Sequence, residues 1–275
     1  MITLKNLTIL MKQVPLQTLN HREVVAVVSL TQQTDIPLYK KGKRPVYRMK
    51  KQILLDFLIP FLVLMSLTIV FWTTPLDITI EEFFYSPEKG WFLKQANPWN
   101  FLYQYGSIPA FTLAIIAVLV IGISFFYHRA LRYRKAAIFL LLVLVIGPGL
   151  ISNAIFKKAW GRPRPRQIVN FGGTENFLPV WVKGVSRKGK SFPSGHASIG
   201  YFMFSPFFFL RRINKKWAVI LLLFGMTYGS FMGIGRMIQG GHFPSDVLWA
   251  GGFTYLTGLG LYYVLRLDRL ETYPS

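Results

Sequence analysis

The chain has 275 residues, of which 52% are hydrophobic and 16% aromatic, and its mean hydropathy is positive. Long apolar stretches in a chain of this length are typical of a single-domain membrane protein. The net charge of +21 is compatible with nucleic acid, anionic lipid or orientation signals, so charge alone does not choose among them. The chain has no cysteine, which excludes a cysteine-based phosphatase, thiolate metal sites and disulfides. No cleavable signal peptide is expected, because residues 1–50 have no sufficient apolar core.

Six stretches are long and apolar enough to cross a membrane as helices, and they predict an all-α, polytopic helical bundle. Pro206 is expected to kink the fourth of them. The spans form one domain, residues 52–265, between an N-terminal tail (1–51) and a C-terminal tail (266–275), both predicted to be cytoplasmic. The predicted spans are residues 52–72, 108–127, 136–156, 192–210, 217–235 and 247–265.

Two polar stretches flank the first span. The N-terminal tail is basic, which predicts contact with the inner leaflet, and residues 24–30 are compatible with a strand. Residues 76–100 mix aromatic side chains with four acids, which predicts an amphipathic segment on the outer interface. These acids are Asp77, Glu81, Glu82 and Glu88.

The distribution of Lys and Arg predicts the orientation of the chain. With the N-terminus inside, the inner segments hold 20 of the 32 basic residues, and 9 of the other 12 lie in one outer loop, residues 157–190. That loop carries one of the motifs described next, so we attribute its charge to function. The remaining loops then follow the positive-inside rule, and both chain ends are predicted to be cytoplasmic.

Three short polar motifs interrupt the apolar chain. They are Lys157-x6-Arg164-Pro165, Pro193-Ser194-Gly195-His196 and Arg236-x5-His242-x3-Asp246. The first two lie between the third and fourth predicted spans and the last between the fifth and sixth, so all three face outward. Helices are expected to begin near His196 and Asp246, and helix N-termini favour a bound anion. The topology therefore predicts one shared anion site on the outer face.

The cations and neutral donors of the motifs suit a phosphate monoester, which carries nearly two negative charges and accepts hydrogen bonds. Arg offers a planar pair of donors and Lys a compact charge. Glycine in the second motif allows the backbone to approach closely. The expected phosphate-binding residues are Lys157, Arg164, Ser194, Gly195 and Arg236.

Of the four histidines, only His196 and His242 fall in outer loops, whereas His21 and His128 fall on the cytoplasmic side. A neutral imidazole can attack phosphorus, and a charged one can protonate a leaving alkoxide. Asp246 follows His242 by four residues, a spacing that lets its carboxylate reach one ring nitrogen and fix the tautomer. These two outer histidines and Asp246 are the expected catalytic residues.

A metal site is an alternative, since four outer side chains could be ligands, namely His196, His242, Asp246 and Glu175. Three clustered cations would repel a divalent ion and attract an oxyanion, so neither a metal nor another cofactor is predicted. Other basic residues of the loop are expected to meet headgroups or to steer substrate, and the outer tryptophans to lie in the interfacial belt. They are Lys158, Arg162, Arg166, Lys183, Arg187, Lys188 and Lys190, and Trp160, Trp181 and Trp249.

The ordered motifs resemble the type 2 phosphatidic acid phosphatase (PAP2) superfamily of integral-membrane lipid phosphatases, whose pattern is K-x6-RP, PSGH and SR-x5-H-x3-D. The resemblance covers roughly residues 53–265 and departs at Gly235, where the family usually has Ser. It implies that His242, oriented by Asp246, forms a phosphohistidine that water hydrolyses. It also implies that His196 protonates the leaving alcohol, that the phosphate-binding residues hold the phosphoryl oxygens, and that no metal takes part.

The resemblance leaves the substrate open. Family members act on phosphatidate, phosphatidylglycerophosphate, polyprenyl diphosphates and lipid A phosphates. Residues 160–165, followed by 171–173, are similar to bacterial lipid A phosphatases, and the basic loop would suit a substrate with several phosphates. The resemblance implies an outer-face enzyme of a bacterial inner (plasma) membrane, whose partners are a lipid phosphate and the bilayer, with no nucleic acid.

Three alternatives remain at this stage, and no oligomeric state is predicted. A phosphotransferase of the same family would pass the phosphoryl group to another lipid instead of water. Haloperoxidase chemistry, which soluble relatives perform in the same pocket, is disfavoured by the membrane spans. A non-catalytic lipid-binding or transport protein is disfavoured because transporters usually place polar groups near the bilayer midplane, whereas these motifs lie at one edge.

Overall fold

A computed structural model of the chain describes residues 46–186 and 188–269. The stretch at 24–30 and nearly all of the basic tail lie outside this part. The chain divides into two units, residues 1–51 and 52–275, and the second contains all three motifs. The described residues are mostly helical, with two isolated bridges and no strand, which confirms the predicted all-α class.

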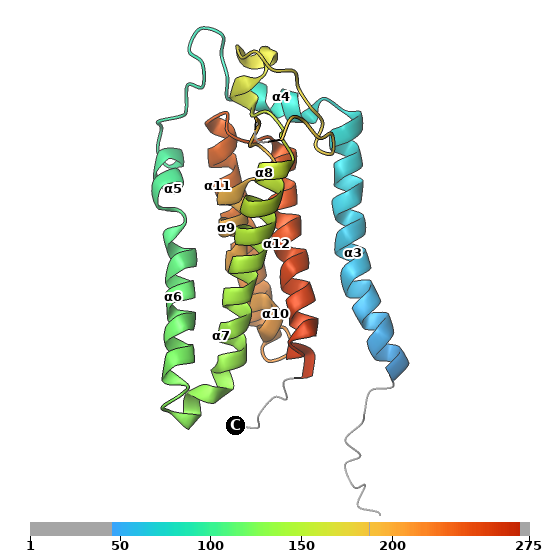
Figure 1. Cartoon of the computed structure of the whole chain (residues 1–275), viewed down its shortest axis with the longest axis vertical. Coiled ribbons are helices and arrows are strands. Elements are labelled where there is room, and N and C mark those ends of the chain that lie inside the picture. The colour runs from blue at the N-terminus through green and yellow to red at the C-terminus, as the bar shows by residue number, and fades with distance from the viewer. Residues whose placement is uncertain (1–45, 187, 270–275) are drawn as a thin grey trace, which may run out of the picture. The chain divides into compact units, whose positions relative to one another are not determined.

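Long helices of the second unit stand side by side as a bundle (Figure 1). They are α3 (Val46–Thr73, of which residues 52–73 belong to this unit), α6 (Ile108–Ile123), α7 (Leu131–Leu144), α11 (Lys215–Ile238) and α12 (Pro244–Val264), and α7 continues through a π-helical segment, Val145–Phe156. The short α-helices are α4 (Leu76–Glu82), α5 (Trp99–Tyr105), α8 (Lys157–Ala159), α9 (Gly195–Tyr201) and α10 (Pro206–Leu210). Short 3-10 turns are His128–Ala130, Pro165–Gln167, Val169–Phe171, Phe202–Phe204 and Leu267–Arg269.

Four helical stretches of the described residues are long and apolar enough to cross a membrane: Lys51–Thr73, Trp99–Ile123, His128–Ala159 and Lys215–Ile238. They correspond to the first, second, third and fifth predicted spans. The fourth is broken into α9, a 3-10 turn and α10, and Pro206 opens the last piece. The sixth corresponds to α12, which is rich in Gly, Thr and Tyr and has many buried residues. The predicted count of six is therefore supported for four spans only.

Close packing of α11 places the third motif. Gly225, Gly229 and Gly233 follow each other at intervals of four and share one face of the helix. A Cβ at Gly229 would lie 2.3 Å from an aromatic ring of α9, and one at Gly233 would lie 2.2 Å from Val247 of α12. Small residues let helices approach closely in this way. As a result, Arg236 in the last turn of α11 lies near the beginnings of α9 and α12.

The outer tryptophans join the long loop between α8 and α9 to the bundle. Trp181 meets Trp160 and Trp249 edge to face, with centroids 5.0 and 4.7 Å apart, and Phe192 packs against all three. Trp249 is buried, and its Nε1 donates to Thr68 Oγ1 at 3.0 Å. The predicted place of Trp249 in an interfacial belt was wrong, because rings far apart in the sequence bury one another. Trp160 and Trp181 are partly buried in the same cluster.

Candidate active site

Five side chains of the motifs line one cavity of about 330 Å³: Lys157, Arg164, His196, Arg236 and His242. They come from α8, the long loop, α9, the end of α11 and the turn before α12. The helix ends that supply them meet at the same end of the bundle as α4 and the long loop (Figure 1). The meeting of the two loops predicted from topology is therefore present. The cavity is completed by Lys94, Gln95, Asn100, Tyr103, Arg166 and Gln239.

Two arginines of this cavity have unused donors. The Nε atoms of Arg164 and Arg236 are buried and have no hydrogen-bond partner. Arg236 is otherwise well placed, because its Nη1 donates to Gln239 and its guanidinium lies 4.6 Å from the centre of the Tyr103 ring. Burial, and then the charge of Arg166, lowers the pKa of Arg164, so this cation is poorly compensated. Buried donors without partners are rare, and a bound anion would satisfy them.

Lys157 is aimed by the turn that precedes it. Its Nζ donates to Asn153 Oδ1 at 3.2 Å, and Asn153 Nδ2 donates to the Pro148 carbonyl at 2.7 Å. Asn153 belongs to the π-helical segment that runs into α8, and such segments are frequent at functional sites. A Cβ at Gly195 would lie 2.4 Å from Asn153 Oδ1 and 3.0 Å from Lys157 Nζ. Glycine at this position therefore lets Asn153 and Lys157 keep their places beside the second motif.

The second motif begins α9. The Ser194 hydroxyl accepts a hydrogen bond from the Ala197 backbone N–H at 3.4 Å and caps the helix. His196 lines the cavity, and its ring stacks on Tyr103 with centroids 5.2 Å apart. Ser194 and Gly195 are buried behind the cavity, so donation from these two residues to a phosphate stays a prediction.

His242 is fixed in one tautomer by the backbone. Its Nδ1 lies 2.5 Å from the Ser191 carbonyl oxygen and 3.8 Å from Asp246 Oδ2. A carbonyl only accepts, so Nδ1 carries the proton and Nε2 keeps its lone pair. At this distance Asp246 does not make the expected direct hydrogen bond to the ring, and the two residues are linked indirectly. Ser191 provides that link, because its hydroxyl donates to Asp246 Oδ2 at 2.5 Å.

The surroundings keep His242 neutral. Burial lowers the pKa of His242 to about 4, although the Asp246 carboxylate acts in the opposite direction. Arg236 and Lys157 lower this pKa further. At neutral pH the ring is therefore uncharged, which is the form that a nucleophile needs.

Asp246 is held on its other side by Arg162, which is fully buried. Arg162 Nη1 donates to Asp246 Oδ1 at 2.6 Å, and Nη2 donates to Asp77 Oδ2 at 2.7 Å. Ser245 closes the group, since its backbone N–H and its hydroxyl donate to Asp77 at 3.0 and 2.6 Å. One guanidinium therefore joins two buried carboxylates from opposite ends of the chain. We call Asp77, Arg162, Ser245 and Asp246 the buried charge cluster.

The predictions for Arg162 and Asp77 were wrong. Neither meets headgroups or the interface, because the Phe177 and Phe243 rings flank the guanidinium at 5.6 and 4.4 Å and α4 turns Asp77 inward. Burial opposes the charge of Arg162, but the carboxylates of Asp246 and Asp77 outweigh it and raise its pKa. The only signal in the sequence is the position of Arg162, two residues before the motif arginine.

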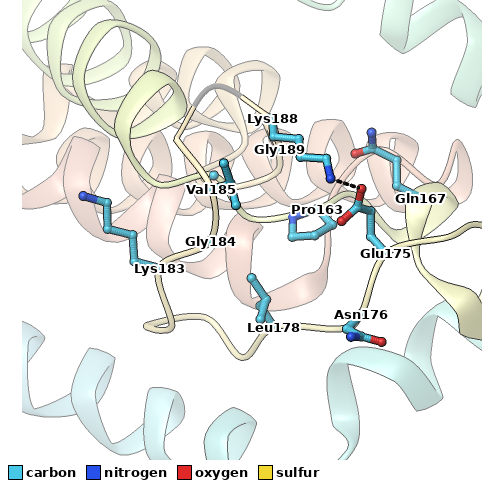
Figure 2. A pocket seen from close by; sticks show the side chains of 11 residues that line it. Pro163, Gln167, Glu175, Asn176, Leu178, Lys183, Gly184, Val185, Lys188 and Gly189 are labelled. Carbon is cyan, nitrogen blue, oxygen red and sulfur yellow. Dashed lines mark ion pairs between the residues drawn. The ribbon is translucent and has the colours of Figure 1, made fainter.

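The long loop also lines a second cavity, of about 440 Å³, which contains none of the predicted catalytic or phosphate-binding residues (Figure 2). Figure 2 shows Glu175 at its edge in an ion pair with Lys188, at 2.9 Å. Glu175 is thus separated from the two histidines with which it could have shared a metal. Among residues 46–186 and 188–269, no group of three or more His, Asp or Glu side chains is arranged to hold a metal ion.

The chain matches known proteins in the region of this site. Residues 136–269 match the model of the PAP2 superfamily. The chain is 34% identical to a protein of Francisella tularensis subsp. novicida named lipid A 4′-phosphatase. The matched region has 193 residues, which is 69% of this chain and 86% of the relative. The chain belongs to the PAP2 superfamily, which confirms the resemblance carried by the three motifs.

Two further relatives share a shorter region. The lipid A 4′-phosphatase of Rhizobium leguminosarum is 32% identical over 128 residues, 46% of this chain and 52% of the relative. Phosphatidylglycerophosphatase B of Bacillus subtilis is 30% identical over 157 residues, 54% of this chain and 64% of the relative. No solved structure matches the chain significantly.

Proposed function

We propose that the protein is a membrane lipid phosphatase that hydrolyses a phosphate monoester or diphosphate of a lipid through a phosphohistidine. One observation carries the proposal: a neutral His242 with a fixed tautomer shares a cavity with His196 and three cations of the motifs. At the level of class, the predicted lipid phosphatase is confirmed, because the family and the names of the relatives agree with it.

The residues have these proposed roles. His242 Nε2 attacks phosphorus, and a nitrogen–phosphorus bond forms while the bond from phosphorus to the lipid oxygen breaks. The electron pair of that bond goes to the lipid oxygen, which takes a proton from His196. The negative phosphate favours the protonated form of His196 before this step. Water then attacks phosphorus, gives a proton back to His196, and the electron pair of the nitrogen–phosphorus bond returns to His242.

The cations stabilise the charge that the phosphoryl group carries during both steps. Lys157 supplies a compact charge, and Arg164 and Arg236 supply the buried Nε donors that are otherwise unsatisfied. Asp246 stabilises the imidazolium-like ring at 3.8 Å. Ser194 and Gly195 are proposed to complete the hydrogen bonds to the phosphoryl oxygens, without a metal.

Lipid A phosphate is the first candidate substrate, because the relative with the greatest shared length among those described is named lipid A 4′-phosphatase. Phosphatidylglycerophosphate is the second, on the name of the Bacillus subtilis relative. Polyprenyl diphosphate and phosphatidate follow from family resemblance alone.

We also propose that α12 and the segment from α9 to α10 cross the membrane with the four apolar stretches, so that domain 52–265 has six spans between tails 1–51 and 266–275. Both tails would be cytoplasmic and the site would face the periplasm. The chain has no cysteine, so a single introduced cysteine reports the exposure of its own position. Lys183→Cys should react with an impermeant thiol reagent from outside and Arg129→Cys only after permeabilisation. The same accessibility for both positions would refute this topology.

The enzymatic proposal is tested by phosphate release from purified protein with one lipid at a time. Wild type should release inorganic phosphate, and His242→Ala should lose at least about a thousandfold in rate. His128→Ala is the matched control, because His128 is exposed and belongs to a 3-10 turn outside the cavity. Release that depends on an added acceptor lipid would identify a phosphotransferase. Lipid binding without any release would favour a transport or binding protein.

A chelator separates the metal alternative. Activity should persist in EDTA, since the phosphate charge is met by side-chain cations. Loss of activity that a divalent ion restores would contradict the assigned chemistry.

A further inference from the structure

The phosphate cavity holds more positive charge than one phosphate monoester needs. Its lining contains no Asp or Glu but five cationic side chains: Lys94, Lys157, Arg164, Arg166 and Arg236. A monoester carries about two negative charges, so about three positive charges would remain without a partner. Like charges confined in one cavity repel each other, and more negative charge in the ligand would relieve this repulsion.

The five cations lie at two depths. Arg236 is buried and Lys157 and Arg164 are partly buried, and these three accompany the two histidines. Lys94 and Arg166 are exposed, although they line the same cavity. The inner three are sufficient to surround a phosphoryl group next to His242. The outer two are the exposed cations of the lining, and we call Lys94 and Arg166 the mouth of the cavity.

The mouth is built from two segments with fixed positions. The Arg166 backbone N–H donates to the Gly240 carbonyl at 3.2 Å, which joins this residue to the turn that carries His242. Lys94 lies in the stretch before α5, and its backbone N–H donates to the Trp91 carbonyl at 3.1 Å. Gln95 and Asn100 line the cavity from the same stretch and add neutral donors.

Within residues 46–186 and 188–269, the side chains of Lys94 and Arg166 take part in no ion pair. The ion pairs among the described residues join other groups, and the only one in the long loop besides Arg162 is that of Lys188 with Glu175. Two exposed cations in the lining of one cavity are suited to bind an anion. A diffuse basic surface would not need them to share the lining of the catalytic cavity.

We propose that Lys94 and Arg166 form a second anion subsite, and that the preferred substrate carries a second phosphate besides the one that is cleaved. This inference rests on the proposed function. It predicts that lipids with two phosphates, whether joined as a diphosphate or separated by a headgroup, are better substrates than a lipid with a single phosphate such as phosphatidate.

The test compares a lipid that carries two phosphates with a related lipid that carries one. The pairs are lipid A bisphosphate with its 4′-monophosphate, farnesyl diphosphate with farnesyl phosphate, and phosphatidylglycerophosphate with phosphatidate of the same acyl chains. Wild type should have the higher kcat/KM for the two-phosphate member of at least one pair, and that pair identifies how the second phosphate is attached. The ratio of kcat/KM for the two-phosphate lipid to kcat/KM for its one-phosphate partner measures this preference. The double variant Lys94→Gln/Arg166→Gln should lower the ratio by about tenfold, mainly through KM.

Controls separate the subsite from general electrostatic attraction. Lys89→Gln/Lys183→Gln removes the same charge from exposed positions that do not line this cavity, and its ratio should equal that of wild type. An equal loss in both double variants, or an unchanged ratio in Lys94→Gln/Arg166→Gln, would overturn the subsite.

Binding to His242→Ala protein gives a readout that does not depend on turnover. The two-phosphate lipid should bind more tightly than its partner, and the difference should disappear in Lys94→Gln/Arg166→Gln. If wild type releases no phosphate from any lipid, the proposed function fails, and this binding difference still decides the subsite. If wild type cleaves both members equally and binding shows no difference, only the subsite fails.

Discussion

Arg162 and Arg164 are separated by one proline, yet the structure uses them in opposite ways. Arg162 is fully buried and its charge is met by Asp77 and Asp246 at 2.7 and 2.6 Å. Arg164 lines the phosphate cavity, next to another cation, with its Nε unsatisfied. One arginine completes a charge-balanced cluster, and the other belongs to a wall that is left unbalanced.

The two kinds of arginine should contribute differently to stability and to activity. A buried guanidinium between two carboxylates is costly to remove, because it leaves uncompensated charge behind. Cations that line one cavity repel each other, and a bound anion compensates their charge. We therefore expect changes in the buried charge cluster to affect folding and catalysis together, and changes in the cavity wall to affect catalysis alone. The four predictions that follow test this distinction, from the largest expected effect to the smallest.

Asp246 joins the two regions, so Asp246→Asn should have the largest effect. The amide keeps the shape of the side chain but removes the charge that stabilises His242, and kcat should fall by about a thousandfold. The carboxylate raises the pKa of His242, so its removal should lower that pKa below about 4. The acidic limb of kcat/KM should accordingly move to lower pH. A pH–rate profile of both proteins measures this, and a limb that moves to higher pH would contradict the arrangement.

Arg162→Met removes the cation of the buried charge cluster. The apolar replacement leaves Asp77 and Asp246 without their cation, which should destabilise the protein by about 3–5 kcal/mol and lower kcat by about a hundredfold. Adding Asp77→Asn removes one of the two stranded charges. The double variant should regain part of the lost stability, measured by thermal unfolding in detergent, but not kcat, since Asp246 is still unsupported. Recovery of both quantities together would mean that Arg162 has only a structural role.

Arg164→Gln tests the unbalanced side. Loss of one cation from the cavity wall should lower kcat/KM by about thirtyfold, because a charge-assisted hydrogen bond to the phosphoryl group is lost. The free energy of unfolding should stay the same or rise, since repulsion from Arg166 is removed. Unfolding and phosphate release are measured on the same preparation. A clear loss of stability would place Arg164 with Arg162 and remove the contrast.

Glu81→Gln should have the smallest effect on activity, with kcat unchanged at neutral pH. Glu81 is buried in α4, and neither of its oxygens has a hydrogen-bond partner. Burial, and then the charges of Asp77 and Asp246, raise the pKa of Glu81 well above its ordinary value, against the opposing charge of Arg162. A carboxyl group with a raised pKa in the folded state stabilises the fold relative to its charged form only while it is protonated.

The pH dependence of stability follows from this sign. In wild type the contribution of Glu81 is complete below the pKa of the unfolded chain and is lost as pH rises through the higher pKa of the folded state. Glutamine does not titrate, so Glu81→Gln should become progressively more stable than wild type as pH increases above about 4.5. A difference in unfolding temperature that is constant with pH would show that Glu81 is charged in the folded protein.

Patterns that are local in the sequence gave the membrane class, most of the helices and the motif residues of the cavity. Hydropathy identified the stretches that became α3, α6, α7 and α11, because apolar length is a property of one segment. The motifs were recognised from the types and order of their residues, and two of them lie where helices begin, at Gly195 and Pro244. Apolar length alone did not support all six predicted spans. One reason is that α12 lies inside the bundle and does not need a fully apolar surface.

The buried charge cluster and the mouth of the cavity were decided only by the tertiary structure. Arg162 and Asp77 lie 85 positions apart, and nothing near either residue indicates that α4 would bring them together. The tautomer of His242 depends on the Ser191 carbonyl, 51 residues away, instead of the nearby carboxylate. Lys94 and Arg166 resemble any other surface cations until the fold places them at one opening. A sequence specifies which charges are present, but burial and distance determine their partners, and these arise only when distant segments pack.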